Sequence, residues 1–169
     1  MRKVLLVIDM QRDFVTGPLG SKEAKAIIPA VMAKVNSYPE KDVFFTRDTH
    51  YADYEQTLEG RMLPVPHCYK GSDGWEIIPE LAKHSNVHNT IDKLTFGYDG
   101  WERFDKDTEF ELCGVCTDIC VISNALAIRM FFPNSKITVD AKCCAGVTPE
   151  KHAAALEVMK SCQIEVIGE

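Results

Sequence analysis

Three separated polar residues have the side chains that an activated cysteine nucleophile requires. Asp9 closes the apolar run 3–8, Lys93 follows a short run around Val87, and Cys120 opens a helix-like stretch. The carboxyl ends of parallel strands lie at one edge of an α/β sheet, where ligands bind. A carboxylate, an ammonium and a thiol at this edge can activate the thiol as a nucleophile. We therefore expect these three residues to be catalytic, although each one alone is more typical of a turn, a solvated surface or a core.

The position of Cys120 distinguishes it from the other cysteines. It lies in the first turn of a predicted helix, where the helix dipole lowers the pKa of a thiol. Cys113 and Cys116 form a CxxC motif, which is compatible with zinc binding or redox chemistry, but the sequence has no second CxxC. We interpret four of the cysteines as buried, unreactive thiols, namely Cys113, Cys143, Cys144 and Cys162.

A second group of residues has the side chains of a metal site. Asp48 and His50 follow a predicted strand, and residues two apart in an extended segment point to the same side. His67 comes after a proline-rich turn that could fold it back toward them, and Glu59 lies in the loop between. Two imidazoles with one or two carboxylates suit Zn²⁺, Fe²⁺ or Mn²⁺. On spacing alone, a loop-capping role for Asp48 and His50 is equally compatible with the pattern.

Aromatic residues near the first group are candidates for substrate binding. Phe14 and Trp101 lie close in sequence to Asp9 and Lys93, so we expect them to line a pocket rather than the core. The histidines outside the metal group lack the spacing of ligands, and we interpret them as surface residues: His84, His88 and His152.

The composition excludes several classes of protein. A chain of 169 residues is long enough for one domain with a buried core, and we expect a single domain over 1–169. The formal net charge is −6 and no basic cluster stands out, which argues against a nucleic-acid partner. No apolar run approaches the ~20 residues of a membrane span, and the first run is too short for a signal peptide. We therefore expect no membrane partner and a cytoplasmic location, where seven cysteines, an odd number, would stay reduced.

Short apolar runs alternate with segments of helical periodicity. The runs predict six strands, at 3–8, 42–46, 86–89, 109–114, 136–139 and 164–167. Helices are predicted at 21–36, 77–83, 118–132 and 149–161, with Pro29 as a kink or start within the first and Thr148 as the cap of the last. The segments 51–70 and 96–107 read as loops. This alternation predicts a doubly wound α/β domain with a six-stranded, mostly parallel sheet and helices on both faces.

Three motifs resemble the catalytic signatures of the isochorismatase-like cysteine hydrolases, and within them the nicotinamidases. Residues 7–14 resemble the aspartate motif, Lys93 with Phe96 and Gly97 resembles the lysine motif, and residues 114–121 resemble the nucleophile motif. Residues 140–152 resemble the C-terminal segment of the family, so that the similarity covers nearly the whole chain.

This resemblance implies both a fold and a reaction centre. The fold is the Rossmann-like, isochorismatase-like arrangement with a six-stranded parallel sheet, and the reaction centre is a triad of Asp9, Lys93 and Cys120. The resemblance also implies a cis peptide bond between Val115 and Cys116. Cys116 itself departs from the family pattern, because alanine is usual at this position.

The resemblance further implies a metal ion. Asp48, His50 and His67 match the metal-binding residues of nicotinamidases, which isochorismatases lack, and Glu59 is expected as a further ligand. One divalent ion is implied, with zinc first and iron or manganese as alternatives. Pro64 stands near the place where nicotinamidases often have a tryptophan.

We therefore predict a homo-oligomeric amidohydrolase that converts a small aromatic amide, nicotinamide, to nicotinic acid and ammonia through a thioester. Lys93 and the helix terminus would stabilise the Cys120 thiolate, Asp9 would move the proton, and backbone N–H groups of Cys116 and Cys120 would form the oxyanion hole. The alternatives are a hydrolase of another small amide and a metal-free isochorismatase-type enzyme. A non-catalytic binding domain of this fold, or a zinc or redox protein using Cys113 and Cys116, also remains open.

Overall fold

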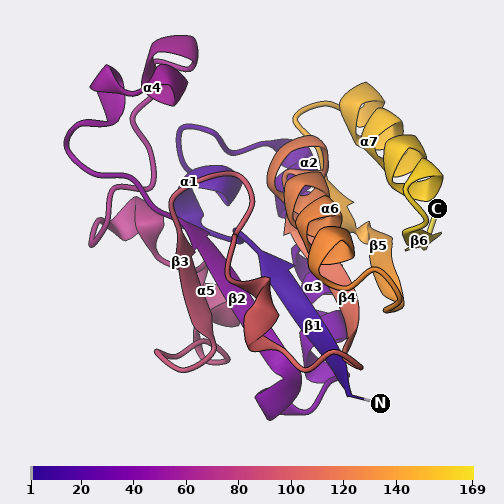
Figure 1. Ribbon diagram of the computed structural model, residues 1–169. Coiled ribbons are helices and arrows are strands. Elements are labelled where there is room, and N and C mark those ends of the chain that lie inside the picture. The colour runs from indigo at the N-terminus through magenta and orange to yellow at the C-terminus, as the bar shows by residue number, and fades with distance from the viewer. Residues whose placement is uncertain (1) are drawn as a thin grey trace.

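The computed structural model describes residues 2–169 and contains a six-stranded sheet in the order β3-β2-β1-β4-β5-β6 (Figure 1). Every neighbouring pair of strands is parallel. The strands are β1 (Lys3–Ile8), β2 (Val43–Asp48), β3 (Thr90–Lys93), β4 (Glu109–Val115), β5 (Ile137–Ala145) and β6 (Glu165–Ile167). The predicted α/β fold with a six-stranded parallel sheet is confirmed.

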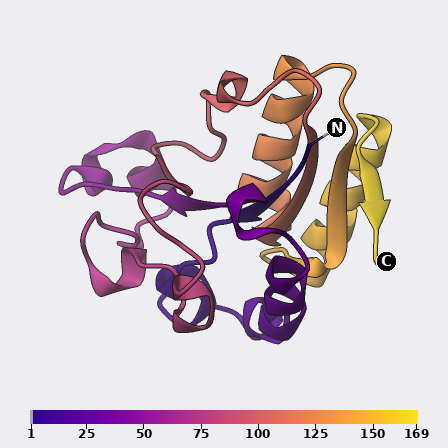
Figure 2. The same ribbon diagram turned by 90° about the horizontal axis from the view of Figure 1, so that it is seen from below.

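Helices pack on both faces of this sheet. They are α1 (Arg12–Val15), α2 (Lys22–Ala26), α3 (Ile28–Asn36), α4 (Leu58–Met62), α5 (Pro79–Ala82), α6 (Ile122–Phe131) and α7 (Pro149–Ser161). Figures 1 and 2 show α3 on one face and α6 on the other. Helices α2 and α3 contact β5, and helices α6 and α7 contact β5 and each other. Within residues 2–169, no helix has the length and apolar character that crossing a bilayer would require.

The strand order reverses at the central strand β1. Strands β2 and β3 extend the sheet on one side of β1, and β4, β5 and β6 extend it on the other. Strand β1 pairs with β2 on one side and with β4 on the other, so that Leu5 lies beside both Val43 and Glu111. Residues Val4 to Ile8 are all fully buried, which makes β1 the centre of the core. A reversal of this kind opens a crevice beyond the carboxyl ends of the two central strands, and ligands bind there in doubly wound folds.

Several predicted elements have different bounds in the structure, among them the third strand and the first helix. The predicted strand 86–89 is a turn, in which Asn86 and Asn89 side chains accept backbone N–H groups, and the strand follows it as β3. The predicted helix 21–36 is divided into α2 and α3 at Ile27, because Pro29 lies in the first turn of α3. The correction to β3 makes Lys93 the last residue of a strand.

The segment predicted as a long loop, 51–70, contains the short helix α4. Thr57 caps this helix by accepting the backbone N–H of Gly60 at 3.0 Å. Figure 1 shows α4 standing away from the sheet, beyond its carboxyl edge. The helix carries Glu59, which therefore reaches the edge from outside the sheet.

Candidate active site

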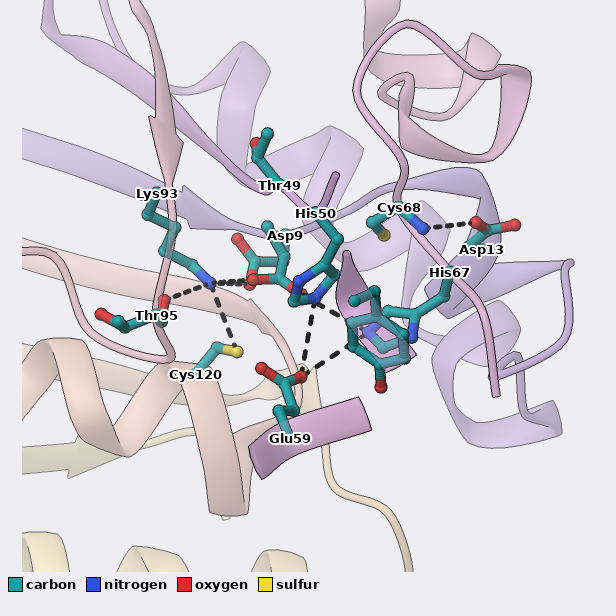
Figure 3. Close-up of polar contacts among 12 residues, drawn as sticks. Asp9, Asp13, Thr49, His50, Glu59, His67, Cys68, Lys93, Thr95 and Cys120 are labelled. Carbon is teal, nitrogen blue, oxygen red and sulfur yellow. Dashed lines mark hydrogen bonds and ion pairs between the residues drawn. The ribbon is translucent and has the colours of Figure 1, made fainter. Parts of the chain in front are cut away.

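The carboxyl edge of the sheet brings Asp9, Lys93 and Cys120 together (Figure 3). Asp9 is the first residue after β1, and Lys93 is the last residue of β3. Cys120 lies in a π-helical turn, Thr117–Val121, that links β4 to α6. The carboxyl ends of three strands, β1, β3 and β4, thus lead to one carboxylate, one ammonium and one thiol.

Asp9 is held in a fully buried position by two neighbours. Its Oδ2 atom lies 2.6 Å from Nζ of Lys93, and its Oδ1 atom accepts a hydrogen bond from Oγ1 of Thr46 at 2.6 Å. The backbone φ of Asp9 is 47°, a left-handed value that is uncommon outside glycine and often marks a functional site. Burial raises the pKa of the Asp9 carboxyl, while the charge of Lys93 opposes this effect. A carboxylate with a raised pKa is a stronger proton acceptor.

Lys93 connects the other polar groups of the site. Besides Asp9, its Nζ atom donates to Thr95 O at 3.2 Å, to Asp48 Oδ1 at 3.4 Å and to Cys120 Sγ at 3.5 Å. Burial lowers the pKa of Lys93, but the negative charges around it raise the pKa to a net value above the ordinary one. The negative charges around it therefore favour the cationic form of the side chain.

The environment of Cys120 differs from the sequence-based prediction. We predicted that the helix dipole and Lys93 would give a thiol of low pKa. Burial instead raises the pKa of Cys120 well above its ordinary value, the charge of Asp9 raises it further, and Lys93 only partly offsets this. Burial and the Asp9 carboxylate therefore favour the neutral thiol form of Cys120 in the free protein.

A second group of side chains adjoins the first. The ligand atoms of Asp48, His50, Glu59 and His67 all lie within 4.8 Å of one another. The Nε2 atoms of His50 and His67 lie 2.8 and 3.6 Å from Asp48 Oδ2, and 3.6 and 3.9 Å from Glu59 Oε1. His67 directs its Nδ1 atom to the carbonyl oxygen of Val65 at 2.8 Å, which leaves Nε2 free to bind a metal.

This donor set fits a divalent transition metal. Two imidazole nitrogens and two carboxylates form a mixed nitrogen and oxygen set that suits zinc, iron or manganese. Asp48, His50 and His67 are buried, and Glu59 is partly buried, so that solvent competes little for the site. No cysteine belongs to such a group anywhere in residues 2–169. The CxxC pair therefore gives no support to a zinc site of its own.

The two aromatic residues predicted to line a pocket occupy different environments. The ring of Phe14 packs against that of His67, with centroids 5.4 Å apart, beside the donor group. Trp101 is instead fully buried in the core and stacks on Phe104. Phe104 in turn contacts Phe44 and Phe110, near the amino ends of β2 and β4. Trp101 also packs edge-on against Tyr98, and its place in a substrate pocket stays a prediction.

Sequence reasoning missed residues that fix the nucleophile turn. Asn124 is fully buried, and its Nδ2 atom donates to the carbonyl oxygens of Cys120 and Phe96. His152, which we interpreted as a surface residue, is partly buried, and its Nδ1 atom lies 2.7 Å from Oγ1 of Thr117. The signal for His152 is visible only in three dimensions, because α7 brings it to the turn.

The cysteines that we interpreted as unreactive thiols have different degrees of burial. Cys113, Cys143 and Cys144 are buried as predicted, whereas Cys162 is partly exposed. Burial raises the pKa of Cys143 to about 12. The peptide bond between Val115 and Cys116 is cis, as the resemblance implies.

Residues 3–168 match the family described as the isochorismatase domain. The chain belongs to the isochorismatase family. This family member is 26% identical to the nicotinamidase/pyrazinamidase of Mycobacterium tuberculosis, over 98% of each protein. The crystal structure of the nicotinamidase/pyrazinamidase PncA of Bacillus subtilis is 28% identical and covers 98% of this chain and 99% of that one, with a TM-score of 0.83. The pyrazinamidase of Pyrococcus horikoshii in complex with zinc is 25% identical over 100% of both chains, with a TM-score of 0.80.

These similarities confirm two predictions made from the sequence of this isochorismatase-family protein. Within the family it resembles the nicotinamidases, and its reaction class is that of an amidohydrolase.

Proposed function

We propose that the protein hydrolyses nicotinamide to nicotinic acid and ammonia through a thioester on Cys120, with one divalent metal ion in the site. The observation that carries the proposal is the position of Lys93 between the two groups. Its Nζ atom lies 2.6 Å from Asp9 and 3.4 Å from Asp48, so that the proton-transfer group and the metal-ligand group share one buried cation. The names of the relatives, nicotinamidase and pyrazinamidase, support an aromatic amide as substrate.

The reaction begins with a proton transfer. Sγ of Cys120 attacks the amide carbon as Asp9 accepts the thiol proton, and Lys93 stabilises the negative charge that develops on sulfur. Backbone N–H groups of Cys116 and Cys120 would bind the oxyanion, each contributing about 3 kcal/mol to the stability of the transition state. Asp9 then donates the proton to the leaving ammonia, and the thioester remains.

Hydrolysis of the thioester repeats these roles. Asp9 accepts a proton from a water molecule that attacks the thioester carbon, and the C–S bond breaks. The proton returns to the sulfur of Cys120, and the carboxylic acid leaves. Lys93 stays charged throughout, which agrees with its raised pKa.

The metal group would recognise the ring. Asp48, His50, His67 and Glu59 would hold the ion, with zinc as the first choice and iron or manganese as alternatives. A bound divalent ion supplies a Lewis acid to which a ring nitrogen can bind. Phe14, which packs against His67, would contact the flat ring beside it.

Ammonia release from a panel of amides tests this proposal. The purified protein is assayed with nicotinamide, pyrazinamide and propionamide, before and after chelation and after zinc is restored. We expect rapid release from the two aromatic amides, loss of activity on chelation and recovery with zinc. Equal rates with propionamide would contradict ring recognition, and full activity without metal would favour a metal-free enzyme. Hydrolysis of isochorismate is measured in parallel, because that activity would reassign the substrate altogether.

A further inference from the structure

We propose that Gln11 and Asp13 are positioning residues that hold the metal-ligand segments against the strand end that carries Asp9. Gln11 would fix Asp48, and Asp13 would fix the segment of His67. The inference rests on the proposed metal site and concerns the groups that shape it. Neither residue has an assigned role in the reaction described above.

Gln11 pairs with Asp48 on the side that faces β1, whereas β3 pairs with it on the other side. The last register pair between β1 and β2 is Val7 with Phe45, so the backbone of Asp48 extends beyond the end of β1. The side chain of Gln11 takes over the pairing, because Oε1 accepts the N–H of Asp48 at 2.7 Å and Nε2 donates to its carbonyl oxygen at 2.9 Å. Nε2 also donates to the carbonyl oxygen of Trp75 at 2.8 Å.

The amide of Gln11 is chemically specific for this role. The residue is fully buried, and its two N–H groups and its oxygen all have backbone partners. A glutamate at this position would place a carboxylate oxygen against the carbonyl oxygens of Asp48 and Trp75, which are also acceptors. A shorter side chain would leave these two carbonyl groups and the N–H of Asp48 without the partner that Gln11 provides. Either change would release the backbone of Asp48 and so shift its carboxylate relative to His50.

Asp13 holds the segment that follows His67. Its Oδ2 atom accepts the backbone N–H of Cys68 at 2.7 Å, as Figure 3 shows, and Cys68 has a left-handed φ of 49°. The same segment pairs with the other histidine, because the N–H of His50 donates to the carbonyl oxygen of Cys68 at 2.9 Å. A Cβ atom at Gly74 would overlap the Asp13 carboxylate, so a glycine is needed there for the carboxylate to fit.

Alternate residues of one short segment therefore serve three parts of the site. Asp9 contacts Lys93, Gln11 pairs with Asp48, and Asp13 binds the backbone next to His67. The five residues from 9 to 13 would set the position of the metal relative to the proton acceptor. A purely structural role would predict a loss of fold stability without a specific loss of metal affinity.

Zinc affinity of the metal-free protein separates these two roles. Gln11→Ala and Asp13→Ala are compared with Asn89→Ala as a matched control. Asn89 is another buried side-chain amide that pairs with strand backbone, but it lies at the amino end of β2, where it donates to the carbonyl oxygen of Val43. Zinc dissociation constants come from competition with a chromogenic chelator, and thermal unfolding of the metal-free proteins reports fold stability.

We expect Gln11→Ala and Asp13→Ala to weaken zinc binding by about 10- to 100-fold. Asn89→Ala should lower the unfolding temperature and leave zinc affinity within about twofold of the wild type. Asp13→Asn should restore the affinity, because an amide oxygen can still accept the N–H of Cys68. If Gln11→Ala does not fold, Gln11→Glu tests the same interaction, with the same loss of affinity expected.

Wild-type zinc affinity in the Gln11 and Asp13 variants would overturn this inference and leave the proposed function intact. An equal loss in Asn89→Ala would overturn it as well, since the effect would then follow fold stability. Absence of zinc binding by the wild-type protein would instead contradict the metal in the proposed function, and the inference with it.

Discussion

Nζ of Lys93 lies 2.6 Å from Oδ2 of Asp9, and neither side chain reaches solvent. Each charge is the main compensation for burying the other, because an isolated ion in a protein interior loses its hydration without gaining a partner. Cys120 Sγ lies 3.5 Å from the same Nζ atom, so the thiol is in direct contact with the ion pair.

The effects of removing Asp9 and Lys93 should be strongly non-additive. Asp9→Asn and Lys93→Met are each expected to lower kcat/KM for nicotinamide by about 10²- to 10⁴-fold. The double variant should be little worse than the worse single variant, because residues that act as a unit fail together. Lys136→Met, at an exposed lysine beside Glu165, is the control and should keep wild-type activity. Multiplying effects would mean that the two residues do not share one step.

The pH dependence of Cys120 alkylation should show a protonated thiol in the absence of substrate. Because burial and Asp9 raise the pKa of Cys120, the thiolate fraction keeps growing with pH. The rate of reaction with iodoacetamide, followed by peptide mass spectrometry, should therefore rise up to about pH 9 without a plateau. Cys120→Ala should have no detectable activity and an unchanged circular dichroism spectrum. A plateau near neutral pH would show that a thiolate is present before substrate binds.

Glu59 should contribute to metal affinity less than the histidines do. It lies 3.6 Å from His50 Nε2, but its side chain is 23% exposed and is carried by the projecting helix α4. Glu59→Gln is expected to weaken zinc binding by about tenfold, and His50→Ala to abolish it. Glu55→Gln, at an exposed carboxylate in the preceding turn, is the matched control. The same affinity in the Glu59 and Glu55 variants would remove Glu59 from the ligand set.

His152 and Thr117 should affect turnover through a single hydrogen bond. Burial lowers the pKa of His152, so the ring is neutral near pH 7 and pairs with the Thr117 hydroxyl next to Cys116. His152→Ala and Thr117→Val should each lower kcat by about tenfold with little change in KM, and their effects should not add. His88→Ala, at an exposed histidine, is the control. Unchanged kcat in both variants would make the contact incidental to catalysis.

Glu111 should make the fold sensitive to acid. Burial raises the pKa of its carboxyl, but hydrogen bonds from Lys3, Lys34 and Tyr38 outweigh this and lower the pKa to about 2. A lowered pKa stabilises the folded state above the ordinary carboxyl pKa, and this stabilisation, up to about 3 kcal/mol, is lost as pH falls from about 4.5 toward 2. The free energy of unfolding, measured with urea, should fall over this range in the wild type and less steeply in Glu111→Gln. Parallel curves would show that Glu111 is not responsible.

Sequence patterns located the elements whose burial is regular. The bounds of β1 and α7 were predicted without error, because β1 is apolar after Lys3 and Thr148 caps α7 with its hydroxyl. Strand β3 was predicted too early, because Thr-Ile-Asp-Lys at the sheet edge has little apolar character and an asparagine turn precedes it. The periodicity of the local sequence cannot identify a strand whose position is set by its pairing with β2.

Site residues were predictable where a carboxylate side chain lies at or just after the end of a strand. Asp9 and Asp48 were found in this way, and the structure brings both to Lys93. The pKa of Cys120 was not predictable, since it depends on burial by distant segments rather than on its place in a helix. His152 was misplaced for the same reason, because its partner Thr117 comes from an element far away in the sequence.

The neutral, buried state of Cys120 also affects chemical durability. Peroxide attacks thiolates, and a cysteine that keeps its proton away from solvent enters the series of sulfenic, sulfinic and sulfonic acids slowly. In the proposed mechanism the sulfur would gain its full nucleophilicity only as Asp9 takes the proton during attack on a carbonyl group. We therefore expect the enzyme to survive oxidants better without substrate than a cysteine enzyme that maintains a standing thiolate.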